Sequence, residues 1–182
     1  MRKVVLSMMV SVDGYMEGKD PEYNWHHWDA EMALYMMEFF KTVDTFIYGR
    51  RSYEAMIAYW PVLNDEFANV MNQTKKIVFS RTLKEVTWNS KLIKNNAVKE
   101  IQYLKKEEGK NLVLFGGADL AETLIENNLV DEFRLIVNPC LLGSGKPLFK
   151  NGSAIKSLKL TDTIKFDCGN VILIYSLNHS WL

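Results

Sequence analysis

The sequence has little of what marks several large classes of protein. Its two cysteines, Cys140 and Cys168, lie far apart and form no Cys-x-x-Cys spacing, which argues against a zinc site and a disulfide framework. Lys plus Arg and Asp plus Glu both number 22, so no bulk charge attracts nucleic acid. No apolar run approaches the roughly 18 residues that a membrane helix requires. We expect no nucleic acid or membrane partner, and a reducing, cytoplasmic location.

What is present is enough apolar residue to build a core. The chain has 182 residues, 48% of them hydrophobic, which favours one domain over residues 1–182. Apolar runs typical of buried strands alternate with helical patterns; the strands are expected at 4–10, 45–48, 76–81 and 111–115, and the helices at 29–42, 49–58, 97–108 and 118–127. Strands separated by helices of this length indicate parallel pairing with crossovers.

The last third of the sequence changes character. A strand at 132–137 is followed by two strand-like runs, 158–166 and 171–175, which flank a turn at 167–170 and predict a hairpin. The sequence therefore predicts an α/β fold whose mixed sheet is mostly parallel and carries an antiparallel C-terminal hairpin.

A glycine pair interrupts the apolar run that ends at Phe115. Without Cβ atoms, Gly116 and Gly117 can adopt positive φ and let a ligand approach bare peptide groups. The helix that follows would point its N–H groups at that ligand, and an anion suits such a place. A tight strand-to-helix turn without a ligand explains the same residues about as well.

Two other strand ends carry residues suited to phosphate. Gly49-Arg50-Arg51-Ser52 joins a strand to a helix start and offers close backbone approach, N–H donors and cations. The alternative is a helix start with two solvated arginines. Ser80-Arg81 ends the next strand and is weak evidence alone, because serine and arginine often end strands.

Asp13-Gly14 follows the first strand and is a strong turn signal. Ligands of open α/β sheets sit at strand ends, so Asp13 could also act as a proton donor or hydrogen-bond acceptor. The donor role requires a site that raises the pKa of its carboxyl group, and ordered water is the alternative proton source.

Two loops offer candidate substrate contacts. The first holds Trp25, His26, His27 and Trp28, whose aromatic rings could line a pocket or cap the core; the adjacent histidines lack a third metal ligand at a recognisable spacing, so we expect no metal. The second, 141–149, contains two glycines and Lys146. It could be a mobile surface loop, a substrate-side loop or a dimer contact.

The order of these pieces resembles the dihydrofolate reductase-like superfamily, and more closely the reductase domain of the bifunctional riboflavin-biosynthesis deaminase/reductase. The resemblance covers nearly the whole chain and rests on five motifs in the right order. They are Ser11-Val12-Asp13-Gly14, Gly49-Arg50-Arg51-Ser52-Tyr53, Ser80-Arg81, Phe115-Gly116-Gly117, and Leu129 to Phe133 leading to Pro139 to Phe149.

The resemblance implies a three-layer α/β/α domain that binds NADPH across the strand ends. It assigns the pyrophosphate to Gly116, Gly117 and the N–H groups of Ala118, Asp119 and Leu120, and a second phosphate contact to Gly49, Arg50, Arg51 and Ser52. It assigns the adenosine 2′-phosphate to Ser80 and Arg81, and arginine there favours NADPH over NADH. It places Val12 beside the nicotinamide and implies a homodimer, and the apolar run 171–174 of the C-terminal hairpin could be the sheet edge that a second copy covers.

Two positions depart from the family pattern. Counting back from Gly49 puts Ala33 where dihydrofolate reductase proper has its acidic residue, and Tyr15 stands where the riboflavin reductase has a basic residue. We expect a reductase that transfers hydride to a C=N or C=O bond of a small substrate, such as 5-amino-6-(5-phosphoribosylamino)uracil or a pterin. Asp13 is the candidate acid, Tyr15, Trp25 and Trp28 are walls, and Lys146 is a substrate contact. The alternative is a catalytically weak NADP(H)-binding module that acts as a sensor or assembly partner.

Overall fold

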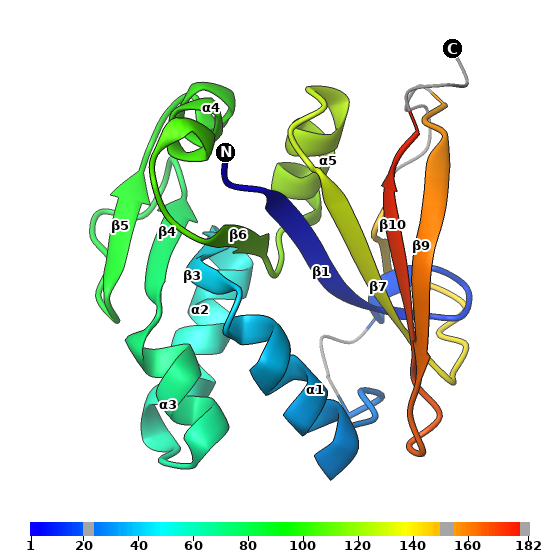
Figure 1. Ribbon diagram of the computed structural model, residues 1–182. Helices are drawn as coiled ribbons and strands as arrows, with labels where there is room; N and C mark the ends of the chain where they lie inside the picture. The colour runs from blue at the N-terminus through cyan, green and yellow to red at the C-terminus, as the bar shows by residue number, and fades with distance from the viewer. Residues whose placement is uncertain (20–23, 150–154, 179–182) are drawn as a thin grey trace.

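The computed structural model describes residues 1–19, 24–149 and 155–178, and eight strands of this part form one mixed sheet. The strand order is β5-β4-β3-β6-β1-β7-β10-β9, with the first six strands parallel and β10 antiparallel to both of its neighbours. Figure 1 shows the N-terminal strand β1 near the middle and the C-terminal hairpin at one edge. The predicted fold class, with its antiparallel C-terminal hairpin, is confirmed.

The strands form where the sequence is nearly continuously apolar, since a parallel strand is covered on both faces. Seven of the eight residues of β1 are buried. The eight strands are β1 (Val4–Ser11), β3 (Val43–Gly49), β4 (Lys75–Phe79), β5 (Ser90–Ile93), β6 (Asn111–Leu114), β7 (Glu132–Asn138), β9 (Leu158–Lys165) and β10 (Val171–Leu177).

In the part of the chain that the structure describes, five α-helices and one short 3₁₀ helix connect the strands: α1 (Ala30–Phe40), α2 (Arg50–Tyr59), η1 (Trp60–Val62), α3 (Glu66–Gln73), α4 (Ala97–Lys106) and α5 (Ala118–Glu126). Side chains cap several helices as expected. Asp29 accepts a hydrogen bond from the Met32 N–H at 2.7 Å, and Asp65 accepts one from the Ala68 N–H at 2.8 Å. By contrast, α2 and α5 begin at Gly49 and Gly117, where no side chain caps the helix.

Helices cover both faces of the sheet and produce two apolar cores (Figure 1). On one face, Ile101 and Leu104 of α4 and Leu124 of α5 pack against the even-numbered residues of β1. On the other face, α1, α2 and α3 pack against Phe46 and Tyr48 of β3. The three-layer α/β/α arrangement is thereby confirmed.

Two features differ from the sequence-based expectation. A second, two-stranded sheet forms because β2 (Tyr15–Glu17) pairs antiparallel with β8 (Lys146–Pro147), which anchors part of the 141–149 loop. The apolar run 171–174, expected at an exposed sheet edge, lies inside the sheet because β9 covers it. In the described part of the chain, no helix is long and apolar enough to cross a membrane.

Candidate active site

Three of the predicted phosphate-binding turns lie at the same edge of the sheet. Phe79 at the end of β4 pairs with Gly49 at the end of β3, and Ile47 of β3 pairs with Leu114 at the end of β6. Because these strands are parallel and in register, Ser80-Arg81, Gly49-Arg50-Arg51 and Phe115-Gly116-Gly117 follow neighbouring strand ends. Such an edge is where open α/β sheets bind their ligands.

The turns at Gly49 and Gly117 are in direct backbone contact. The Gly49 N–H donates a hydrogen bond to the Gly116 carbonyl oxygen at 3.2 Å. A Cβ placed on Gly117 would stand 3.2 Å from the Gly49 Cα, and Gly117 has a φ of +94°, which favours glycine. Two helices that lack side-chain caps therefore begin beside each other, at the positive ends of their dipoles.

Gly116 also has no room for a Cβ. A Cβ at this position would lie 2.2 Å from Ser52 Oγ, so the first turn of α2 packs against the bare backbone before α5. The neighbouring arginines differ in their surroundings. Arg50 forms an exposed ion pair with Glu54 at 3.2 Å, whereas Arg51 lines the adjacent cavity.

Ser80 and Arg81 occupy the turn after β4. Ser80 is buried, and its Oγ accepts hydrogen bonds from the N–H groups of Thr82 and Leu83 at 3.2 and 3.0 Å. This turn holds Arg81 exposed at the same sheet edge as Gly49.

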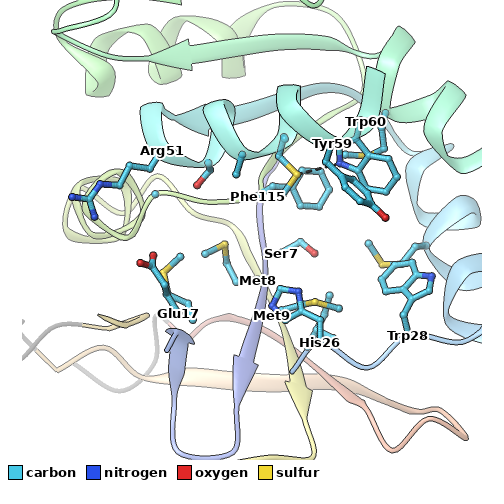
Figure 2. A pocket seen from close by; sticks show the side chains of 18 of the residues that line it. Ser7, Met8, Met9, Glu17, His26, Trp28, Arg51, Tyr59, Trp60 and Phe115 are labelled. Atoms are coloured by element: carbon cyan, nitrogen blue, oxygen red, sulfur yellow. Dashed lines mark hydrogen bonds between the residues drawn. The ribbon is translucent and has the colours of Figure 1, made fainter. Parts of the chain in front are cut away.

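A cavity of about 790 Å³ opens beside the turns that precede α2 and α5, between the sheet, α1 and α2, and its lining does not include Ser80 or Arg81. This volume is typical of sites for cofactors and small molecules. Its floor comes from β1 and its roof from α2 (Figure 2). The lining residues used below are Ser7, Met8, Met9, Glu17, His26, Trp28, Phe40, Arg51, Ser52, Tyr59, Trp60, Phe67, Phe115, Gly117 and Lys146.

The two ends of the cavity differ in chemistry. Arg51 and Glu17 lie at one end and Trp28, Tyr59 and Trp60 at the other (Figure 2). Lys146 belongs to the charged end because β8 pairs it with Glu17. The crossing of these strands is tight, since a Cβ on Gly145 would lie 2.1 Å from the Glu17 carbonyl oxygen.

Ser7 and His26 lie between the two ends (Figure 2). Ser7 is 2% exposed, and its Oγ has no hydrogen-bond partner among the described residues. Burial lowers the pKa of His26 to about 4, so its imidazole is neutral at neutral pH. His27, the other member of the histidine pair, instead places its Nδ1 at 3.1 Å from the Cys168 carbonyl oxygen.

Asp13 does not meet the condition set for a proton donor. The Ser11 hydroxyl donates to its carboxylate at 2.6 Å, and the N–H groups of Leu142 and Gly143 donate to it at 3.1 and 2.7 Å. The Ser11 hydrogen bond, helped by these backbone donors, lowers the pKa of Asp13 instead of raising it. The carboxylate joins the end of β1 to the 141–143 loop and lies outside the cavity lining.

Two of the four candidate substrate contacts line the cavity and two do not. Trp28 and Lys146 line the cavity, whereas Tyr15 and Trp25 lie outside its lining. Trp25 packs edge-on against His26, with ring centroids 4.2 Å apart. It therefore supports a residue that lines the cavity and does not line the cavity itself. Val12 is 62% exposed and lies outside the lining as well.

Several lining residues carry no signal of their role in the sequence. Ser7 lies within an apolar strand, Glu17 in the three-residue strand β2, and Tyr59 and Trp60 at a helix end. Among these residues only Ser7 has a signal in the sequence, because it is a polar residue that interrupts an apolar run.

Comparisons with known proteins found similar proteins by sequence and by fold. The profile of the RibD C-terminal domain matches residues 2–172. YyaP of Bacillus subtilis (strain 168), whose name describes it as uncharacterized, is 38% identical over 182 residues, covering 97% of this chain and 96% of its own.

Two solved structures show the same fold at lower identity. A putative riboflavin biosynthesis protein from Shewanella sp. PV-4 superposes with a TM-score of 0.78 at 20% identity, covering 98% of this chain and 100% of the other. Dihydrofolate reductase from Enterococcus faecalis, complexed with NADP(H), superposes with a TM-score of 0.65 at 15% identity, covering 97% and 96%.

Proposed function

Because the chain belongs to the RibD C-terminal domain family, whose members are reductase domains of dihydrofolate reductase-like fold, we propose that it is an NADPH-dependent reductase. It transfers a hydride to the carbon of a C=N or C=O bond in a small substrate. The candidate substrate classes are a pyrimidine intermediate such as 5-amino-6-(5-phosphoribosylamino)uracil and a pterin.

The observation that carries the proposal is the contact between Gly49 and Gly117. It brings the uncapped N-termini of α2 and α5 together beside Arg51, and a Cβ at either glycine would fill the space. Backbone N–H groups, two helix dipoles and a cation suit the diphosphate of a dinucleotide. Arg81, exposed beside this place, suits the 2′-phosphate that distinguishes NADPH from NADH.

The residues of this chain would bind and orient the cofactor and the substrate and exclude water from them. Arg51, Ser52 and Gly117 would bind the phosphate groups of NADPH. The apolar Met8, Met9 and Phe115 line the middle of the cavity. When bound, NADPH supplies the hydride. The protein's contribution is to hold the reacting groups in productive geometry away from bulk solvent.

The reduction also consumes a proton. Asp13 is engaged with the 141–143 loop and has a lowered pKa, so it is a poor acid. Ordered water entering at the charged end of the cavity is the proposed proton source.

The test is an NADPH titration followed by a screen of C=N and C=O compounds for NADPH oxidation. Saturable NADPH binding and turnover of at least one compound support the reductase. Binding without turnover of any compound would favour a catalytically weak NADP(H)-binding module that acts as a sensor or assembly partner. Failure to bind either nicotinamide dinucleotide would refute both.

A further inference from the structure

The end of the cavity opposite Arg51 is built from aromatic side chains, and we call Trp28, Tyr59, Trp60 and Phe67 the aromatic end. The rings contact one another: Phe67 lies 5.4 Å from both Trp28 and Trp60, and Tyr59 lies 4.9 Å from Trp60, measured between centroids. Phe40 extends the cluster behind Phe67 at 5.4 Å. A flat ring can contact such a surface over most of its area.

Among the residues that the structure describes, the aromatic end has no cation for a phosphate. The charged side chains that line the cavity are Arg51, Glu17 and Lys146, and all three belong to the opposite end (Figure 2). A smaller cavity of about 280 Å³ continues past Trp28 and Tyr59, and its charged lining residue is the acidic Asp65. A phosphorylated arm that left the aromatic end would meet a carboxylate and no counter-charge, which disfavours its binding.

One polar group in the middle of the cavity has no hydrogen-bond partner within residues 1–19, 24–149 and 155–178. Ser7 Oγ is buried on β1, and the neighbours of Ser7 on the same face of this strand, Val5 and Met9, are apolar. Buried hydroxyl groups are nearly always hydrogen-bonded, so an unpartnered one that faces a cavity indicates a ligand group. A serine hydroxyl can donate to a carbonyl or ring nitrogen, and can accept from a ring N–H.

We propose that the substrate is a planar, uncharged ring compound without a phosphorylated arm, which stacks in the aromatic end and hydrogen-bonds to Ser7 through its polar edge. This inference rests on the proposed function and narrows it. His26, which also lines the cavity, is neutral and adds no charge to this part of the site. In the balanced reaction, the C=N or C=O carbon gains the hydride, its heteroatom gains a proton from water, and NADPH becomes NADP⁺.

The test uses calorimetric titration of protein saturated with NADP⁺. The probes are lumazine, a planar uncharged bicyclic ring, and uridine 5′-monophosphate, a pyrimidine with a phosphorylated arm. We expect lumazine to bind at least about tenfold more tightly, since one lost hydrogen bond or unpaired charge is of that order. Equal or tighter binding of the nucleotide, or no binding of lumazine, would overturn the proposal.

Ser7→Ala tests the hydrogen bond, with Ser90→Ala as the matched control because the Ser90 hydroxyl donates to Trp88 O outside the cavity. Ser7→Ala should weaken lumazine about tenfold, leave the NADP⁺ affinity unchanged and not lower the melting temperature, because it removes an unsatisfied buried group. Ser90→Ala should leave lumazine binding unchanged. An unchanged lumazine affinity in Ser7→Ala overturns the role of Ser7, whereas a protein that binds no NADP⁺ refutes the proposed function itself.

Discussion

Gly117 lies so close to Gly49 that a Cβ on Gly117 would stand 3.2 Å from the Gly49 Cα. This one contact brings together two strand-to-helix turns that are almost 70 residues apart in the sequence. It explains why neither helix has a side-chain cap: a capping side chain at either glycine would occupy the space where two sets of N–H groups converge.

Gly117→Ala should therefore destabilise the protein and weaken dinucleotide binding. Alanine would be strained at a φ of +94° and would also press on Gly49, with a combined cost of about 2–4 kcal/mol. Urea unfolding and NADPH titration measure the two effects.

Gly143→Ala is the matched control for this substitution. Gly143 has a φ of +69°, but a Cβ there would meet nothing within 4 Å. Gly143→Ala should lower the free energy of unfolding by the backbone strain alone, about 1 kcal/mol, and leave NADPH affinity unchanged. Equal effects of the two substitutions would show that the contact with Gly49 is unimportant.

Asp13→Asn should loosen the 141–143 loop without abolishing turnover. The asparagine side chain replaces one carboxylate oxygen with an NH₂ group, which cannot accept the hydrogen bond that Leu142 or Gly143 donates. Hydrogen exchange at these two amides should accelerate. If Asp13→Asn abolished NADPH oxidation at every pH and left hydrogen exchange at the Leu142 and Gly143 amides unchanged, Asp13 would again be the candidate proton donor.

Lys76 makes stability depend on pH in the alkaline range. It is fully buried, its Nζ donates to the carbonyl oxygens of Asn72 and Thr74, and it lies 4.1 Å from the centroid of the Trp88 ring. Burial lowers its pKa from 10.5 to about 8. Below pH 8 both the folded and the unfolded state are protonated, and the folded state bears the full cost of a buried charge.

Between about pH 8 and 10.5 the folded state loses this proton first, so the unfolded state binds more protons and stability rises with pH. The gain is at most roughly 3 kcal/mol. Urea unfolding of wild type and Lys76→Met across this range measures it, because the variant lacks the titrating group. The stability of wild type relative to Lys76→Met should increase with pH; a constant difference would contradict the assignment.

A homodimer remains our expectation, with a different surface from the one first considered. The edge strand next to β10 is β9, in which Lys159 to Thr163 are all exposed, including Leu160 at 50%. An edge strand exposed in this way is suited to pairing with a second copy. Light scattering should give about twice the 21.1 kDa chain mass, and a monomer mass at working concentration would exclude the dimer.

The elements that the sequence predicted well depend on local signals. The glycine pair and the nearly continuous apolar strands can each be recognised from a few adjacent residues. The lining of the cavity could not be predicted in this way, because Ser7, Glu17, Tyr59 and Phe67 come from separate elements and meet only through tertiary packing. Trp25 and Trp28 look equivalent in the sequence, and packing against His26 separates their roles.

We propose that this chain binds NADPH across the ends of β3, β4 and β6, with Arg81 at the adenosine 2′-phosphate. Titration of NADPH and NADH into wild type and Arg81→Ala tests it most directly, with Lys84→Ala as control for a nearby exposed cation. We expect Arg81→Ala to weaken NADPH about tenfold or more and NADH hardly at all, since a charged hydrogen bond is worth about 1.5–3 kcal/mol. Equal weakening of both dinucleotides, or no binding of NADPH to wild type, would contradict the account.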